Sequence, residues 1–84
     1  MSEIKETVLE CIVQSMKIAD VAHKMPGKSY DSERSIVKEM ASLAIVVFSY
    51  GIESKEALDA ANNLTTANIG MIEIIENSKV NKND

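Results

Sequence analysis

Residues 36–50 have the sequence IVKEMASLAIVVFSY, and this stretch decides the fold class. The six apolar residues at 43–48 include side chains that favour β-strands, so a buried strand is one interpretation. However, the apolar positions of the whole stretch recur in alternating steps of four and three, which is the spacing of one face of an α-helix. These positions are Ile36, Met40, Leu43, Val47 and Tyr50. No other segment offers a strand for pairing, and we therefore predict a helix over residues 31–50.

Two breakpoints bracket this helix. Pro26-Gly27 removes a backbone donor and adds freedom, and it is followed by residues that favour turns and helix N-caps. Gly51 can take the left-handed conformation that ends a helix, and Ser54 is placed to cap the next one. The segments on either side have the same four-and-three spacing, so we predict helices over about 3–25 and 54–77.

The third segment contains the weakest helical sequence. Residues 62–66 (NNLTT) have poor helix propensity, and Gly70 costs roughly 1 kcal/mol relative to Ala inside a helix, so a kink or break near 62–66 is an alternative to one continuous helix. The tail at 78–84 has one apolar residue and is expected to fray. The fold prediction is thus all-α, with a single domain at 1–77 built of three antiparallel helices joined by short connections.

Composition limits the classes of function. The chain has 84 residues, 13 acidic against 9 basic side chains, a net charge of -4 and one cysteine. This length suits one small domain, and the acidic balance argues against a strongly basic nucleic-acid-binding protein. The N-terminus is acidic and resembles no signal peptide, and the most apolar stretch is shorter than the roughly 20 residues that cross a bilayer. We expect a cytoplasmic protein without a disulfide.

Catalytic, metal and cofactor chemistry find little support in the sequence. The one histidine and the one cysteine, 12 residues apart, cannot provide four zinc ligands, and Cys11 lies on an apolar helix face where a free cysteine is usually inert. Residues 22–29 (AHKMPGKS) fit a loose phosphate-loop spelling, but no buried strand precedes them. We therefore expect no enzymatic activity and no cofactor.

One short stretch nevertheless suggests a possible function in phosphate transfer. Ala22-His23 followed by Gly27 resembles the histidine-phosphotransfer domains, over about six residues. The resemblance implies a four-helix bundle whose phospho-accepting histidine would be His23. Pro26 stands where that family has a lysine that continues the helix, so the helix should end within one turn of His23.

The second alternative is a helix-turn-helix DNA-binding regulator centred on Gly51. Its reading helix would be residues 54–63, with Lys55, Asn62 and Asn63 offered to base edges. Against this alternative, three acidic side chains in or beside the same helix would face phosphates. They are Glu53, Glu56 and Asp59.

Two packing anomalies support the hypothesis that we prefer, namely that this protein acts by binding protein. The helix at 31–50 is apolar nearly all round and is expected to be the central, most buried element, yet three helices would struggle to cover its Ile45, Val46 and Phe48. Left uncovered, these side chains would form an apolar patch of the kind that marks an interface. Asn68 lies in the middle of an apolar stripe, where it either fixes register or oligomeric state, or bonds a backbone carbonyl at a kink near Gly70.

From these anomalies we predict a small acidic protein that acts by binding protein, as a regulator, inhibitor, adaptor or chaperone-like factor. A homodimer that forms a larger helical bundle is expected. The predicted partner or dimer interface consists of Ile45, Val46, Phe48 and Asn68.

Overall fold

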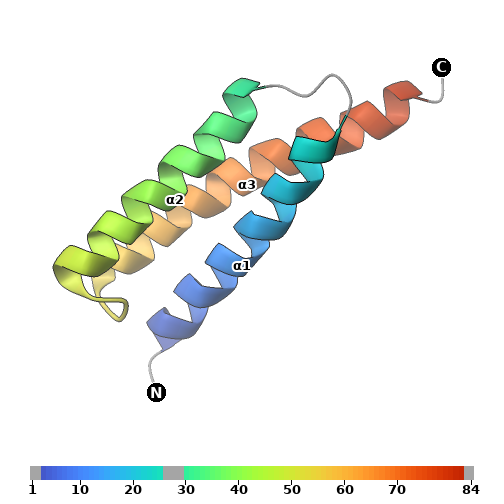
Figure 1. The fold of residues 1–84 in the computed structure, drawn as a ribbon. Coiled ribbons are helices and arrows are strands. Elements are labelled where there is room, and N and C mark those ends of the chain that lie inside the picture. The colour runs from blue at the N-terminus through green and yellow to red at the C-terminus, as the bar shows by residue number, and fades with distance from the viewer. Residues whose placement is uncertain (1–2, 26–29, 83–84) are drawn as a thin grey trace.

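The computed structural model describes residues 3–25 and 30–82 and consists of three α-helices packed as a bundle (Figure 1). They are α1 (Glu3–Lys24), α2 (Tyr30–Tyr50) and α3 (Lys55–Lys82). No strand occurs in the described part of the chain, so the all-α prediction is confirmed and the strand interpretation of 43–48 is wrong. The start of α1 lies at the same end of the bundle as the connection between α2 and α3.

The connection between α2 and α3 forms as the sequence indicates. Gly51 has a φ of 98°, and its backbone N–H donates to the carbonyl of Val47 over 2.9 Å, which closes the end of α2. The hydroxyl of Ser54 accepts a hydrogen bond from the backbone N–H of Ala57 over 3.0 Å, so Ser54 caps α3. The other predicted breakpoint, Pro26-Gly27, lies outside the described residues.

α3 passes through residues 62–66 and Gly70 as one helix, so the alternative of a break near 62–66 is wrong. Packing explains this outcome: Leu64 is fully buried, and tertiary burial of one helix face outweighs weak local propensity. The hydroxyls of Thr65 and Thr66 donate to carbonyls one turn earlier in the same helix, at 2.9 and 3.2 Å. α3 also continues past residue 77 to Lys82, since neither glycine nor proline follows Gly70 to stop it.

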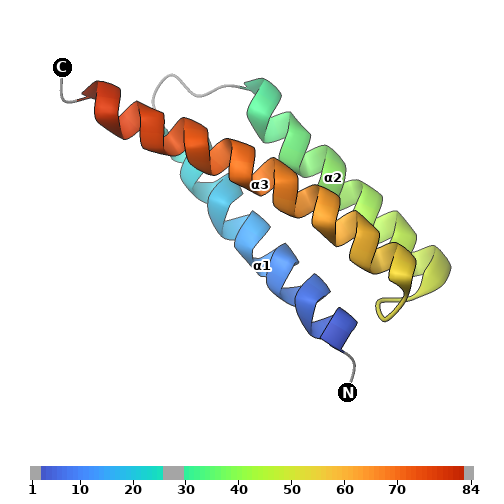
Figure 2. The ribbon, with the colours of Figure 1, turned by 180° about the vertical axis from the view of Figure 1, so that it is seen from behind.

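α3, and not α2, is the central helix of the bundle. It packs extensively against both other helices, whereas α1 and α2 contact each other much less. Figure 2 shows α3 in front, with α1 and α2 both behind it. Among its described side chains α2 buries only Ile36 and Leu43 fully, which corrects the expectation that it is the most buried element.

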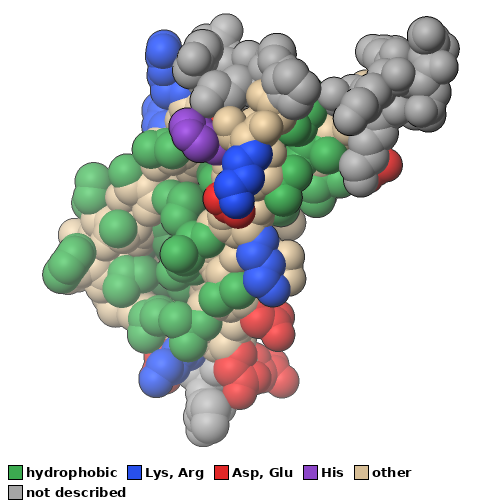
Figure 3. All heavy atoms as spheres, turned by 45° about the vertical axis from the view of Figure 1, so that its right-hand side comes forward, with side chains coloured by type: hydrophobic (Ala, Val, Ile, Leu, Met, Phe, Trp, Pro, Cys, Tyr) green, Lys and Arg blue, Asp and Glu red, His purple; other side chains and the backbone are tan. Residues whose placement is uncertain are grey.

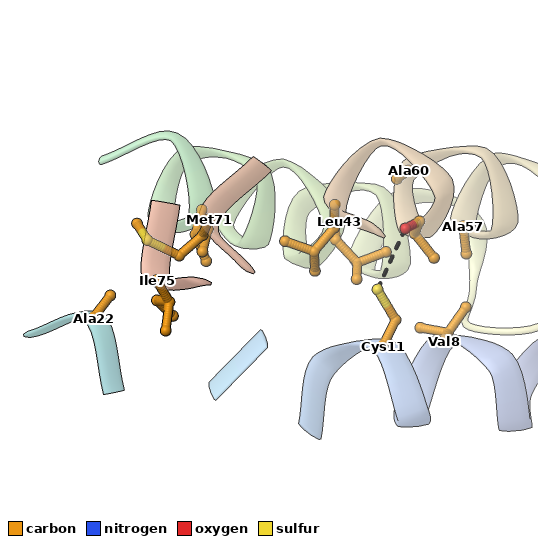
Figure 4. Packing of buried hydrophobic residues seen from close by; sticks show 11 residues of the cluster. Val8, Cys11, Ala22, Leu43, Ala57, Ala60, Met71 and Ile75 are labelled. Carbon is orange, nitrogen blue, oxygen red and sulfur yellow. Dashed lines mark hydrogen bonds between the residues drawn. The ribbon is translucent and has the colours of Figure 1, made fainter. Parts of the chain in front are cut away.

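Small residues give α3 this central position. The alanines at 57, 60 and 61 are all buried, and side chains of this size let two neighbouring helices approach the same stretch of backbone. Figure 4 shows Ala57 pointing toward Val8 of α1, and the buried apolar residues of all three helices form one core. The eleven buried apolar residues of this core are Val8, Cys11, Ala22, Ile36, Leu43, Ala57, Ala60, Ala61, Leu64, Met71 and Ile75.

Candidate interaction surface

The relative orientation of α1 and α2 is marked by one contact between them. His23, in the last turn of α1, places its Nδ1 3.0 Å from Oε1 of Glu33, near the start of α2. The side of each helix that carries this contact is therefore the side turned toward the other helix. Tracing that side along α1 and α2 shows which residues border the junction between them.

On α1 the traced side is apolar. Steps of four and three residues back from His23 pass through Ala19, Met16, Ile12 and Leu9, none of them charged, before they reach the exposed Lys5 near the start of the helix. Ile12 and Ala19 are partly buried against the core, while Met16 and Leu9 are 59% and 44% exposed. α1 therefore presents large apolar side chains to solvent beside α2.

On α2 the corresponding side is equally apolar. Steps of four and three forward from Glu33 pass through Val37, Ala41, Ala44 and Phe48. Phe48 is 91% exposed and Val37 is 60% exposed, which are large fractions for side chains that are usually buried. α2 thus continues the exposed apolar surface that α1 begins.

Together the two helices form one exposed apolar surface. Figure 3 shows hydrophobic side chains gathered across this side of the molecule, with the acidic groups at its edge. Ile45, which is 65% exposed and lies three residues before Phe48, extends the surface along its outer margin. We call the surface the α1–α2 face, and its large exposed members are Leu9, Met16, Val37, Ile45 and Phe48.

The structure divides the three apolar residues that the sequence grouped on α2. Ile45 and Phe48 are exposed as expected, but Val46 is partly buried and packs against the core, so its expected exposure is wrong. Leu9, Met16 and Val37 are exposed members of the surface that were not predicted from the sequence. For Leu9 and Met16 the sequence held a signal, which is a second apolar stripe that runs through both residues. This stripe makes α1 apolar over more of its circumference than one neighbour can cover.

The fourth predicted interface residue, Asn68, lies in a buried polar seam between α1 and α3. Its Nδ2 donates to Oγ of Ser15 over 2.8 Å, and that hydroxyl donates to the carbonyl of Cys11 over 2.7 Å. The Sγ of Cys11 contacts the Ala61 carbonyl at 3.3 Å, shown as a dashed line in Figure 4, and Oγ1 of Thr65 at 3.4 Å. We define the polar seam as Cys11, Ser15, Thr65 and Asn68.

Asn68 accordingly acts inside one chain. It is only 5% exposed and belongs to the α1–α3 packing, which does not support its expected place at an intermolecular interface. Its hydrogen bond to a side chain of α1 also differs from the alternative of a bond to a backbone carbonyl at a kink. The geometry favours the fixing of helix register, because an Asn–Ser pair aligns α1 and α3 at one height.

The surface beside the polar seam is hollowed but offers little chemistry. The hollow has a volume of about 310 Å³, and Glu10 is the one ionisable carboxyl among its lining residues. The other lining residues are Thr7, Cys11, Gln14, Ile18, Thr65, Asn68, Ile69 and Ile72. Within residues 3–25 and 30–82, no group of three or more His, Cys, Asp or Glu side chains is placed to hold a metal ion.

The residues of the two alternative functions are arranged differently from what those functions need. α2 and α3 lie lengthwise against each other (Figures 1 and 2), whereas helix-turn-helix units cross their helices at about 90–120°. Lys55, Asn62 and Asn63 are exposed on α3, but the acidic Asp59 is exposed between them. Of the phosphate-loop and phosphotransfer stretch, residues 26–29 lie outside the described part of the chain, and His23 is in the last turn of α1.

Comparison with known proteins adds no further assignment. A scan against protein-family models, a search of curated proteins and a search of solved structures each found no match to this chain. Within its described residues, none of the three helices has the combined length and apolar character that a bilayer crossing requires. The function must therefore be inferred from the surface itself.

Proposed function

We propose that this chain is a small, non-catalytic protein-interaction module and that the α1–α2 face is the surface by which it binds. One observation carries the proposal: large apolar side chains from two helices lie side by side and exposed, with Phe48 91% exposed. Contiguous apolar patches of this kind are rare on monomeric soluble proteins and usually mark interfaces. The class that fits is a regulator, inhibitor, adaptor or chaperone-like factor of the cytoplasm.

The chemistry of the face indicates the kind of contact. On the traced side of α1, no charged residue lies between Leu9 and Ala19. On the traced side of α2, none lies between Val37 and Phe48. Affinity on such a surface comes from the burial of apolar area, at roughly 25 cal/mol for each Å² removed from water. An amphipathic helix laid along an apolar surface is one recurring way to bury it.

A comparison of immobilised variants tests the proposal. Wild-type chain and a Phe48→Glu variant are each fixed to beads, exposed to native lysate, and compared for the proteins they retain. We expect the variant to lose proteins that the wild type retains, since a carboxylate within the face would have to be desolvated in any complex. Ile69→Glu is the matched control, because Ile69 is 53% exposed on α3 and outside the face.

The result is informative in either direction. Equal retention by wild type and Phe48→Glu would reject the α1–α2 face as the binding surface. Far-UV circular dichroism checks that each variant keeps its helices, so that loss of retention cannot be attributed to unfolding. Loss in Phe48→Glu together with normal retention in Ile69→Glu supports the proposal.

A further inference from the structure

We propose that the occupant of the α1–α2 face is a second copy of the same chain, packed face to face about a two-fold axis that runs along the bundle. This inference rests on the proposed function and names the partner on that surface. Such a dimer would place α1 of each copy against α2 of the other, with the two α3 helices outside. Three observations support it: the amount of exposed surface, the charges at the margins of the face and the position of the acidic groups.

The chain exposes more surface than a compact monomer of its size. Its accessible surface is 5844 Å² for a mass of 9.2 kDa, whereas monomers of this mass expose about 4900 Å². Part of the excess belongs to the end of α3, which runs past the other two helices (Figure 1).

The margins of the face carry opposite charges on the two helices. On α1, Asp20 lies one turn after Met16; on α2, Arg34 and Lys38 are one turn apart, on the side that also carries Ile45. All three charged residues are exposed. An acid at the margin of α1 and bases at the margin of α2 make the face self-complementary when α1 of one copy meets α2 of another.

The heights of these charges agree with the two-fold arrangement. Both helices run away from the His23–Glu33 contact, and an α-helix rises 1.5 Å for each residue. Asp20 is then roughly 4.5 Å from the level of that contact, while Arg34 and Lys38 are roughly 1.5 and 7.5 Å from it. A two-fold axis along the bundle keeps these heights, so Asp20 of one copy falls between Arg34 and Lys38 of the other.

Asp20 can take part in this contact although it already has a partner. Its Oδ2 accepts from Nζ of Lys24 over 3.0 Å, in an exposed pair within one helix. A carboxylate has about four acceptor positions, so one hydrogen bond from Lys24 leaves capacity for a base of the second copy.

Seven further acidic residues on α1 and α3 lie away from the proposed contact, whereas Glu33 borders the α1–α2 junction beside His23. Each copy has a net charge of -4, and like charges close to an interface would oppose association. The acidic residues in the first half of α1 lie on its side away from the traced apolar side. Those of α3 lie on the helix that is on the outside of the proposed dimer. They are Glu3, Glu6 and Glu10 on α1, and Glu56, Asp59, Glu73 and Glu76 on α3.

Analytical ultracentrifugation of the full chain over a range of concentrations tests the dimer. We expect a species of twice 9.2 kDa that dissociates on dilution. Phe48→Glu should raise the dissociation constant by about thirtyfold or more, because each dimer would bury two carboxylates in place of two aromatic rings. Ile69→Glu, which adds the same charge on α3, should leave the constant within about twofold of the wild type.

A charge exchange tests the two-fold geometry separately. Asp20→Lys alone and Lys38→Asp alone should each weaken the dimer by about threefold to tenfold at low salt, and the double variant should recover most of the loss. High salt should reduce these differences, since exposed charges are screened. Additive weakening in the double variant would overturn the proposed arrangement.

The outcomes separate this inference from the proposed function. A chain that stays monomeric at several hundred micromolar, or a dimer that Phe48→Glu does not weaken, overturns the second copy as occupant. If a monomeric chain still retains another protein, and Phe48→Glu abolishes that retention, the proposed function stands while the dimer is rejected. If the chain neither associates nor retains any protein through Phe48, both are rejected.

Discussion

The side-chain amide of Asn68 donates a hydrogen bond to the hydroxyl of Ser15 over 2.8 Å, and this contact ties the middle of α3 to the middle of α1. Both residues are buried, Ser15 completely and Asn68 to 5% exposure. The Oδ1 atom of the same amide is buried and has no hydrogen-bond partner among the described residues. The pair therefore aligns two helices, while one buried acceptor is left without compensation.

Substitutions of Asn68 should separate these two effects. We expect Asn68→Ala to lower the free energy of unfolding by about 1–3 kcal/mol, because the Ser15 hydroxyl loses its donor and a small cavity forms. Asn68→Leu should cost less, since it fills the volume and removes the unpartnered acceptor. In the double variant Ser15→Ala/Asn68→Leu, stability should be close to that of the wild type or above it.

Urea unfolding followed by far-UV circular dichroism measures these differences. Asn62→Ala is the control, because Asn62 is exposed on the same helix and its side chain should contribute less than about 0.5 kcal/mol. The interpretation of the seam is rejected if Asn68→Leu destabilises more than Asn68→Ala does.

The two described glycines should respond to alanine in opposite directions. Gly51 has a φ of 98°, where an L-residue is disfavoured by about 1–2 kcal/mol, so Gly51→Ala should lower the stability by that amount. Gly70 lies inside α3 and has open space around the position of an added Cβ, so Gly70→Ala should raise stability by about 1 kcal/mol. Thermal unfolding of the two variants beside the wild type checks both signs. A stabilising Gly51→Ala would contradict the role of that glycine in closing α2.

The extent of the helices, apart from the end of α3 at Lys82, could be predicted because periodicity and end signals agree. Gly51 and Ser54 act on neighbouring backbone groups only, so their effect is visible in the sequence. The central position of α3 could not be predicted in the same way. It depends on the close approach that Ala57 and Ala61 allow, and alanine adds little to a hydrophobicity pattern although both residues are buried.

The candidate surface was predictable in part, for a related reason. The sequence shows that α2 has more apolar side chains than its neighbours can cover, and Ile45 and Phe48 are indeed exposed. It does not show how α2 is rotated against α3, and that rotation turns Val46 inward. The pairing of Asn68 with Ser15 was hidden for the same reason, since it depends on the relative height of α1 and α3.

Binding to DNA should be absent at low salt. Because α2 and α3 lie lengthwise against each other, the part of α3 that carries Lys55 and Asn62 does not project from the bundle as a reading helix does. Asp59, which lies between them, would repel phosphates. We expect no mobility shift of short duplexes at about 50 mM salt, where non-specific binding is strong for proteins that neutralise phosphates. A salt-sensitive shift that disappears in Lys55→Glu would instead support the helix-turn-helix alternative.

Two adjacent residues of α2, Ile45 and Val46, should give opposite results when each is changed to glutamate. Ile45 is 65% exposed, so Ile45→Glu should change the free energy of unfolding by less than about 0.5 kcal/mol when the chain is dilute enough to be monomeric. Val46 packs against the core beside α3, so Val46→Glu should lower it by about 2 kcal/mol or more, because a carboxylate must then be partly desolvated. Val46→Ala, which adds no charge, should cost about 1 kcal/mol and shows how much of the loss is packing alone. Urea unfolding at one pH measures all three variants, and equal losses in Ile45→Glu and Val46→Glu would mean that α2 is rotated differently against α3.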